Sequence, residues 1–374
     1  FYDNNFSSAA MSLQGFNEFK LPEFVVSRYW KNFTIQSSNE CKQWKGDENK
    51  GVVLDFAKFR QYLADDCIAN GGDLLMGFSY VSKECTEDGE IIARLQSKKR
   101  TTNLSVKTKL IVDATGPSRK VIYSNRSKLP KMEVSTGVEY MIKVSDNIYT
   151  KFKDDLFFFL GDRWCYKGYS WIFPMDNNIL KVGTAKMVSK DTNTSSESLK
   201  QITERIISDY MKAGDSVVID IHGGSVSTTR DFSEKFYEKN VVAIGDSISS
   251  INPLGGEGIR YALRSADNVT EHILNYVNKA ENTFEKYRKT WRKKHLFTWK
   301  LCFFLVDNVY HKYPDKKIDE RIKKYHNLVD IDQLINMFFE FKFNKIFRRV
   351  GFLLLSRVKS KFSKKRDNEA SRTN

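Results

Sequence analysis

The sequence predicts a mixed α/β fold: an open α/β domain interrupted by an antiparallel sheet domain and followed by a helical extension. Two short apolar runs, residues 109–112 and 240–244, each stop abruptly at a polar turn, as the buried strands of an open sheet do. Between them, residues 134–180 are rich in β-branched and aromatic residues with short polar breaks, which is typical of an antiparallel sheet. Beyond residue 283 the pattern is helical and basic.

The individual elements follow from apolar runs, from helical periodicity and from glycine or asparagine at the stops. The elements expected in chain order are a strand at 52–54, a helix ending at 70–72, strands at 73–82 and 91–95 around a hairpin at 86–90, a helix over 195–213, and a strand at 240–244 followed by a helix over 258–279. The length of 374 residues predicts two or three domains at about 150 residues each. The expected boundaries are 1–130 and 231–285 for the two parts of the open α/β domain, 131–230 for the sheet domain and 286–374 for the extension.

Composition excludes several classes of protein. A hydrophobic share of 41% is enough to bury a core, so disorder along the whole chain is excluded. The five cysteines form no C-x-x-C pair, which argues against a disulfide framework and a thiolate zinc site and indicates a reducing, cytoplasmic compartment. The five histidines show no metal-ligand spacing, so no metal site is expected, and His222, which precedes two glycines, is expected in a loop.

The most informative stretch is residues 241–259, which read VVAIGDSISSINPLGGEGI. A hydrophobic strand delivers Asp246 to its carboxyl end, where ligands bind in open α/β sheets. The turn after Pro253 contains three glycines, which allow the backbone to approach a ligand without a Cβ in the way. The helix that follows offers unpaired N–H groups and the positive end of its dipole.

This combination suits a flavin better than a bare phosphate. The Asp246 carboxylate can accept hydrogen bonds from the ribityl hydroxyls, and the helix end can face the electron-rich N1–C2=O edge of the reduced ring. The alternative is a purely structural strand–turn–helix in which Asp246 is an N-cap and the glycines permit close packing. The spacing of Pro253 and the glycines after Asp246 favours the cofactor site.

Residues 245–259 resemble the second flavin motif of the FAD-dependent oxidoreductases related to p-hydroxybenzoate hydroxylase. Within that superfamily, the Gly-Glu-Gly-Ile ending and the YALRS sequence at 261–265 are most similar to the geranylgeranyl reductase family. Residues 112–116 (VDATG) resemble the middle motif, whose turn lies beside the dinucleotide. Residues 168–174 (GYSWIFP) resemble the Tyr-x-Trp-x-Phe-Pro signature of the reductases' substrate domain.

The resemblance implies an FAD/NAD(P)-binding Rossmann-like domain interrupted by a substrate-binding sheet. The residues expected at the cofactor are Gly245, Asp246, Pro253, Gly255, Gly256, Gly258, Ile259, Thr115 and Gly116. The implied reaction is hydride transfer from reduced flavin to a carbon–carbon double bond of an isoprenoid, with NAD(P)H or ferredoxin as the electron donor.

The substrate is expected to lie against an aromatic strand. Tyr169, Trp171 and Phe173 alternate with smaller residues, so a strand places all three rings on one face. That face can line an apolar pocket for a prenyl chain, and the alternative is an ordinary aromatic sheet core. The phenol of Tyr169 is a candidate proton donor to a substrate carbon.

The sequence also departs from the family pattern. It contains no G-x-G-x-x-G and begins Phe-Tyr-Asp, which suggests a fragment that lacks the N-terminal flavin motif and binds FAD poorly alone. The Cys-Gly-Gly often found near the flavin is replaced by residues 7–10 (Ser-Ser-Ala-Ala). The usual Arg and Phe-Asp of the helix after the first strand pair are matched only by Phe56 and Phe59-Arg60, and Tyr166 takes the place of a proline.

The C-terminal stretch carries a membrane hypothesis. From residue 321 onward, Lys and Arg outnumber Asp and Glu by 14 to 5. Residues 345–366 combine an apolar helical face with flanking cations, a pattern that can lie peripherally at a membrane surface. The alternative is a terminal helix docked on the body with a solvated basic tail. No nucleic-acid-binding motif accompanies the net charge of +15, so no nucleic-acid partner is expected.

Two other functions remain open at this point. A flavin monooxygenase or halogenase shares the same fold, although the W-x-W-x-I-P signature of halogenases is absent from the sequence. A non-catalytic, membrane-associated protein with a degenerate flavin fold is the second, and the missing arginine and Cys-Gly-Gly support it weakly.

Overall fold

The computed structural model describes residues 7–99, 101–188 and 197–342. Residues 1–331 belong to one compact unit and residues 332–374 to a second. The predicted membrane segment at 345–366 lies outside the described residues. The helices are α1 Leu13–Glu18, α2 Phe56–Ala69, α3 Asp146–Phe152, α4 Leu199–Arg205, α5 Ile259–Lys279, α6 Phe284–Val309, α7 Asp315–His326 and α8 Ile331–Phe338.

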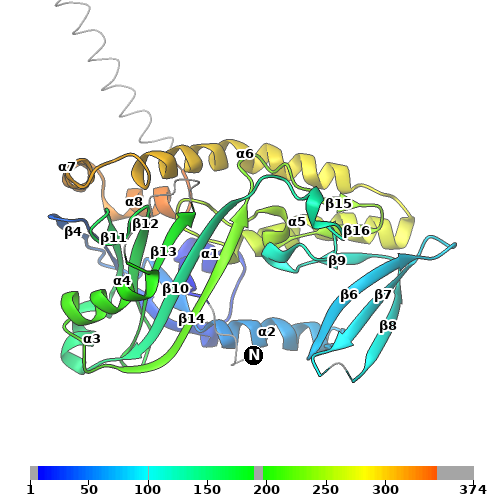
Figure 1. Ribbon diagram of the computed structural model, residues 1–374, viewed down its shortest axis with the longest axis horizontal. Helices are drawn as coiled ribbons and strands as arrows, with labels where there is room; N and C mark the ends of the chain where they lie inside the picture. The colour runs from blue at the N-terminus through cyan, green and yellow to red at the C-terminus, as the bar shows by residue number, and fades with distance from the viewer. Residues whose placement is uncertain (1–6, 100, 189–196, 343–374) are drawn as a thin grey trace, which may run out of the picture. The chain divides into compact units, whose positions relative to one another are not determined.

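A seven-stranded sheet forms the largest element of the first unit (Figure 1). Its order is β14-β10-β13-β12-β11-β3-β4, with β3 Asn32–Gln36, β4 Cys41–Trp44, β10 Glu133–Lys143, β11 Asp155–Leu160, β12 Gly168–Pro174, β13 Ile179–Val188 and β14 Val217–Thr228. The expected antiparallel sheet therefore forms, but it reaches outside the predicted range 131–230, because β3 and β4 join it. It is also not wholly antiparallel, since β11 pairs with β3 in parallel.

A buried carboxylate joins the distant segments of this sheet. Asp155 at the start of β11 accepts hydrogen bonds from Thr34 Oγ1 at 2.6 Å and from Gln43 Nε2 at 2.9 Å. The backbone N–H groups of Lys31 and Asn32 donate to the carbonyl of Asp154. Such pairing between segments more than 100 residues apart leaves no local pattern in the sequence, which explains why it was not predicted.

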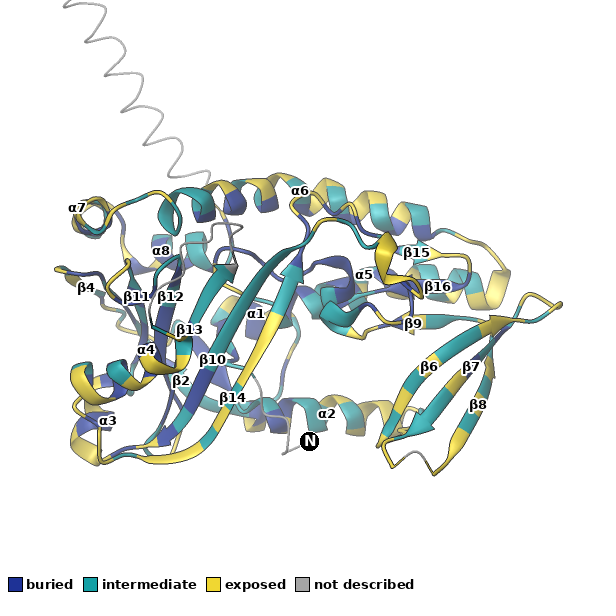
Figure 2. Cartoon of the chain, in the orientation of Figure 1, coloured by how far each residue is buried: buried dark blue, intermediate teal, exposed yellow. Residues whose placement is uncertain are grey.

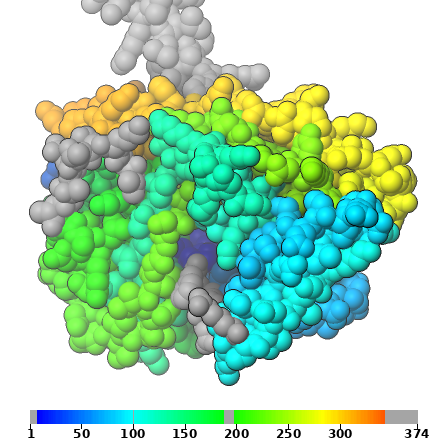
Figure 3. Space-filling view, turned by 45° about the vertical axis from the view of Figure 1, so that its right-hand side comes forward, coloured from blue at the N-terminus to red at the C-terminus, as the bar shows by residue number. Residues whose placement is uncertain are grey.

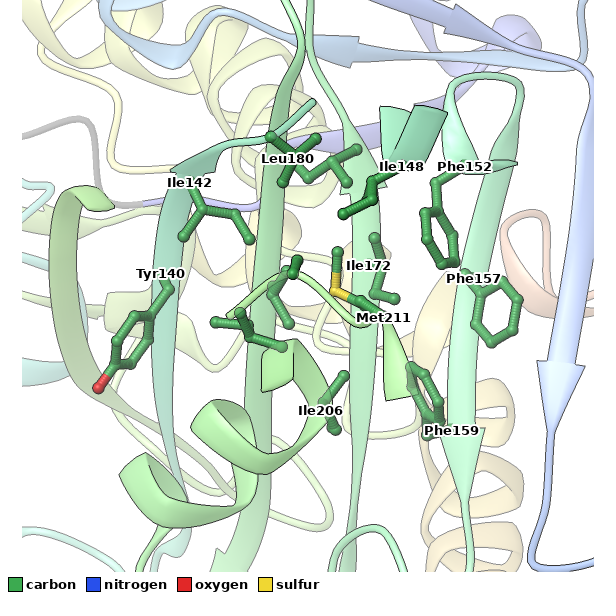
Figure 4. Close-up of a cluster of buried hydrophobic side chains, with 14 of the residues drawn as sticks. Tyr140, Ile142, Ile148, Phe152, Phe157, Phe159, Ile172, Leu180, Ile206 and Met211 are labelled. Atoms are coloured by element: carbon green, nitrogen blue, oxygen red, sulfur yellow. The ribbon is translucent and has the colours of Figure 1, made fainter. Parts of the chain in front are cut away.

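One face of the sheet is covered by α3 and α4, and the side chains between them form an apolar cluster (Figure 4). The helix expected over 195–213 is shorter than predicted. A capping box between Ser198 and Gln201 starts α4, which gives way to a π-helical turn at Ile206–Tyr210. The π-helical turn contributes Ile206 and Ile207 to the cluster, so packing of these side chains accompanies the departure from a regular helix.

Three smaller sheets complete the first unit. They are β1-β5-β2 (β1 Ala10–Ser12, β2 Val26–Trp30, β5 Gly51–Leu54), β6-β7-β8 (β6 Phe78–Cys85, β7 Ile91–Ser97, β8 Asn103–Thr108) and β15-β16-β9 (β9 Ile111–Asp113, β15 Tyr237–Glu238, β16 Val241–Ala243). The strand expected at 73–82 begins only at Phe78. Gly77 has a φ of +78°, a conformation that suits a turn before the strand and not the strand itself.

The pairing of β9 with β16 is parallel, as the sequence predicted for an open α/β sheet. The long helix α5 follows β16 at the predicted position. Within the described ranges, no helix has both the length and the apolar character needed to cross a bilayer.

Candidate functional site

The carboxyl ends of β9 and β16 bring two predicted turns together. The buried Asp113 carboxylate accepts hydrogen bonds from Thr115 N at 2.9 Å and from Ile122 N at 2.8 Å, which fixes the turn after β9. Ser247 Oγ, in the turn after β16, donates to the Gly116 carbonyl at 3.2 Å. Thr115 and Gly116 therefore lie beside the turn that carries Asp246, as a shared dinucleotide site requires.

Asp246 lies in the short 3₁₀ helix Gly245–Ile248. Its carboxylate accepts a hydrogen bond from Ser250 Oγ at 3.3 Å. Burial raises the pKa of Asp246, and the positive charge of Arg119 partly opposes that shift. Gly258 is the N-cap residue of α5, and no side chain caps this helix, so the interpretation of Asp246 as a helix cap is wrong.

The glycine turn between Asp246 and α5 is open on one side. A Cβ built on Gly255 meets no atom within 4 Å, and Gly256 has a φ of +69°, which favours glycine. Asn252 holds the turn from inside, because its Oδ1 accepts from Leu254 N at 2.8 Å. Pro253 is buried in this turn, next to Leu254.

Two tyrosines connect this turn to the rest of the unit. Tyr169 of β12 donates its hydroxyl to the Gly255 carbonyl at 2.9 Å. Tyr310, just after α6, donates to the Leu254 carbonyl at 2.8 Å, and the two phenol rings stack with their centroids 5.8 Å apart. Burial raises the pKa of Tyr169, so its hydroxyl keeps its proton at neutral pH. The aromatic strand is thereby held against the predicted cofactor turn.

The residues present fit the flavin end of FAD. The backbone is exposed at Gly255, where a Cβ would meet no atom within 4 Å. Helix α5 begins without a side-chain cap, and the Asp246 carboxylate lies beside the start of that helix. Ile259, the first residue of α5, packs against the N-terminal cluster that includes Ala9 and is half-buried. No side chain in this group is a phosphate ligand, in agreement with the missing G-x-G-x-x-G.

The three predicted substrate residues share one face of the seven-stranded sheet, opposite the apolar cluster. The ring centroids of Tyr169 and Trp171 are 5.6 Å apart, and those of Trp171 and Phe173 are 6.2 Å apart. Trp171 and Phe173 are buried, whereas Tyr169 is half-buried. Figure 3 shows the molecular surface hollowed between β14 and the β6-β7-β8 sheet, with N-terminal chain at the base of the hollow.

A row of polar groups crosses the same face and was not predicted. Strand register places Trp171, Gly183, Glu139 and His222 side by side on β12, β13, β10 and β14. The Trp171 indole lies over Gly183, where a Cβ would come within 2.2 Å of the ring, and donates Nε1–H to Glu139 Oε2 at 2.8 Å. His222 Nε2 lies 3.3 Å from Glu139 Oε1. His222 is thus a strand residue, and its expected place in a loop was wrong.

One signal could have pointed to this row. Glu139 lies between Val138 and Tyr140, Lys181 lies between Leu180 and Val182, and both charged residues are buried. Charged side chains in such positions are rarely buried without a partner. The partners themselves could not be found, because they depend on the register of strands far apart in the chain.

The segments that depart from the family pattern make specific contacts in the structure. Asp55 caps α2 by accepting from Lys58 N at 3.1 Å. The Arg60 guanidinium lies 5.7 Å from the centroid of the Phe56 ring on the same helix. Ser8, in the segment expected to take the place of Cys-Gly-Gly, donates its hydroxyl to Glu139 Oε2.

Comparison with known proteins agrees with this geometry. Residues 134–226 match the family model described as geranylgeranyl reductase catalytic domain, a span from β10 to β14. A digeranylgeranylglycerophospholipid reductase of Haloferax volcanii is 24% identical over 87% of this chain and 80% of its own length. A reductase of the same name from Methanocaldococcus jannaschii is 23% identical over 84% of this chain and 78% of its own length.

Among solved structures, a geranylgeranyl bacteriochlorophyll reductase-like protein of Thermoplasma acidophilum superimposes with a TM-score of 0.69 at 19% identity, covering 88% of this chain and 87% of that one. Flavin-dependent halogenases and monooxygenases share the fold at lower identity. The predicted fold and the resemblance to geranylgeranyl reductases are confirmed. The enzyme class that these matches support is an FAD-dependent oxidoreductase of the reductase type, and the monooxygenase, halogenase and non-catalytic alternatives are not favoured.

Proposed function

We propose that this protein reduces carbon–carbon double bonds in the isoprenoid chains of a lipid, with FAD as its cofactor. The reductases that match over most of the chain support a lipophilic substrate of this class. The single observation that carries the proposal is the hydrogen bond from Tyr169 to the Gly255 carbonyl. It joins the aromatic strand, which suits a prenyl chain, to the glycine turn, which suits a flavin.

The residues of the site take the following roles in this proposal. Reduced flavin, when bound, supplies hydride chemistry. Asp246 accepts hydrogen bonds from ribityl hydroxyls, and the turn at Gly255 with the start of α5 faces the ring. Thr115 and Gly116 lie beside the dinucleotide. The remaining cofactor residues in the proposal are Gly245, Pro253, Gly256, Gly258 and Ile259.

Tyr169, Trp171 and Phe173 form the apolar wall that holds the substrate and excludes water from it. NAD(P)H or ferredoxin is the proposed electron donor. Peripheral contact of residues 345–366 with a membrane surface would bring the protein to a lipid substrate and is part of the proposal.

Flavin retention tests the cofactor site. The holoenzyme is purified with Asp246→Ala, and the ratio of flavin to protein absorbance is compared with that of the unaltered protein. The variant is expected to retain less FAD, because the carboxylate proposed to bind the ribityl hydroxyls is gone. Asp267→Ala, which removes an exposed carboxylate on α5, is the matched control. Equal retention by both variants would contradict the assignment of Asp246.

Substrate turnover tests the reaction. Under anaerobic conditions, reduced holoenzyme mixed with a geranylgeranyl lipid is expected to yield a product heavier by two hydrogens per double bond. Mass spectrometry measures the product. Consumption of NADPH coupled to oxygen, with an oxygenated product, would instead indicate a monooxygenase.

A further inference from the structure

A row of polar side chains lies on the same sheet face as the predicted substrate residues, and the proposed function assigns it no role. It consists of His222, Glu139 and Trp171 across the strands, with Ser8 and Lys181 beside them. Glu139 is 3% exposed and Lys181 is fully buried. Taking a charged group out of water is strongly unfavourable until it is paired. Packing of the sheet alone would not require buried charged residues on this face.

Glu139 is the centre of the row. Its Oε2 accepts hydrogen bonds from the Ser8 hydroxyl and from Trp171 Nε1, and its Oε1 lies 3.3 Å from His222 Nε2. Lys181 lies on the same face and donates from Nζ to the carbonyl of Ser7. One carboxylate thus joins an imidazole on one side to a hydroxyl on the other.

The charges around His222 favour its protonated form. Burial alone would lower the pKa of His222, but the hydrogen bond and negative charge of Glu139, together with Asp220, outweigh it and raise the pKa. Asp220 Oδ2 lies 3.2 Å from His222 Nδ1. Burial would raise the pKa of Glu139, but His222, Lys181 and Ser8 hold it below its usual value. Burial lowers the pKa of Lys181, and the charges of Glu139 and Asp55 oppose that shift.

The row runs from the sheet edge toward the candidate cofactor turn. In the described residues β14 pairs with β10 alone, and Asp220, whose Oδ2 lies 3.2 Å from His222 Nδ1, has a side chain that is 39% exposed. At the other end, Ser8 precedes Ala9, which belongs to the cluster that packs against Ile259 at the start of α5. Ala9 has a φ of +54°, a strained conformation for alanine, and such strain clusters at functional sites.

Reduction of a carbon–carbon double bond needs a proton as well as a hydride. The hydride pair forms one C–H bond, and the π electrons form the second with a proton from the protein. We propose that Ser8, Glu139 and His222 supply this proton, an inference that rests on the proposed function. The Ser8 hydroxyl turns from Glu139 and gives its proton to the carbon. The Ser8 oxygen then takes a proton from the Glu139 carboxyl group, which has itself been protonated by His222. His222 then takes up a proton from water by way of Asp220, which lies against its Nδ1 and is partly exposed.

Kinetics of the full-length holoenzyme test the proposal. The rate of double-bond reduction by pre-reduced enzyme is measured from pH 5 to pH 9. In the unaltered protein the rate is expected to fall as the pH rises through the pKa of His222. His222→Gln, Glu139→Gln and Ser8→Ala are each expected to slow reduction about 100-fold. The histidine variant is also expected to lose the pH dependence, and Ser8→Thr is expected to restore the rate, because it keeps the hydroxyl.

Two control variants distinguish this proposal from a general effect of replacing a histidine and from proton donation by Tyr169. His272→Gln replaces a part-buried histidine on α5, away from the row, and is expected to leave rate and pH profile unchanged. Tyr169→Phe removes the other candidate proton donor, and its pH profile is expected to keep the shape of the unaltered protein. A pH profile lost in Tyr169→Phe but kept in Glu139→Gln would overturn the proposal.

A second readout does not depend on turnover. Histidine NMR of the holoenzyme is expected to show His222 titrating above 6.5, the usual value, and to show its pKa falling in Glu139→Gln. Failure of the unaltered protein to reduce any prenyl lipid would reject the proposed function. Normal reduction with unchanged rates in Glu139→Gln and His222→Gln would reject the proton route alone.

Discussion

The two faces of the seven-stranded sheet are built from alternate residues of the same strands, yet they differ in chemistry. On β12, Ile172 points into the apolar cluster under α3 and α4, whereas Trp171 points to the opposite face. The first face consists largely of aliphatic and aromatic side chains (Figure 4). The second carries the aromatic wall and buried charges, whereas β14 at the edge of the sheet is largely exposed (Figure 2). The difference indicates that the first face serves mainly to stabilise the fold, whereas buried charges on the second face call for another role, and we propose that this face forms the site.

The largest expected effect lies on the apolar face. Phe159 is fully buried and contacts the rings of Phe157, Trp164 and Tyr210. Phe159→Ala is expected to lower the free energy of unfolding by about 3–5 kcal/mol, because it leaves a cavity. Chemical denaturation measures the change. Phe304→Ala, which truncates an exposed phenylalanine on α6, should stay within about 0.5 kcal/mol of the unaltered protein. Equal effects of the two would contradict the packing of Phe159 in the apolar cluster.

A smaller loss of stability is expected from a substitution on β13, at the glycine over which the Trp171 ring lies. Gly183→Ala introduces a Cβ that would lie 2.2 Å from the indole ring, so the ring must leave Glu139. We expect a loss of about 1–3 kcal/mol of stability and a changed tryptophan fluorescence. Gly224→Ala is the matched control on β14, because a Cβ there meets nothing within 4 Å. An unchanged emission spectrum in Gly183→Ala would show that the indole is not held over this glycine.

The charged residues of the second face, His222 and Glu139, should make the stability of the protein depend on pH. The raised pKa of His222 contributes stability that is fully present below 6.5 and is lost as the pH rises through the folded value. The lowered pKa of Glu139 contributes stability that is present above 4.5 and is lost as the pH falls through the folded value. The stability difference between the unaltered protein and His222→Gln is therefore expected to be largest between pH 4.5 and 6.5.

Thermal unfolding across that range measures the difference, with His272→Gln as the control. Burial lowers the pKa of His272, so its contribution does not peak in the same interval. A His222→Gln difference that is flat with pH would mean that His222 and Glu139 do not interact as charges.

The smallest expected effect concerns the contact between sheet and glycine turn. Tyr169→Phe removes one hydrogen bond to the Gly255 carbonyl and is expected to reduce stability by about 0.5–1.5 kcal/mol. Calorimetry measures the change. Tyr276→Phe on α5, where the tyrosine contacts Phe284 through its ring, should have a smaller effect. A larger loss in Tyr276→Phe would argue against Tyr169 as the connection.

Local patterns predicted the parts of this structure that depend on short stretches of chain. The strand and turn at Asp246, the helix after it and the alternation of rings at 169–173 all follow from neighbouring residues. The row at Glu139 does not, because Glu139, Gly183 and His222 meet only through the register of three strands. The helix over 195–213 was placed correctly but too long, since contacts of Ile206 and Ile207 determine where the regular helix ends.

The parallel pairing of β11 with β3 affects how the chain acquires its structure. Because β3 precedes its neighbour by more than 100 residues, the large sheet is not complete until the polypeptide has closed a long loop, an event that slows folding. Residues 131–230 expressed alone would leave the edge of β11 without its native neighbour, and bare strand edges promote aggregation. We therefore expect residues 134–226, the region that matches the catalytic-domain family, to be less stable when expressed without β3 and β4.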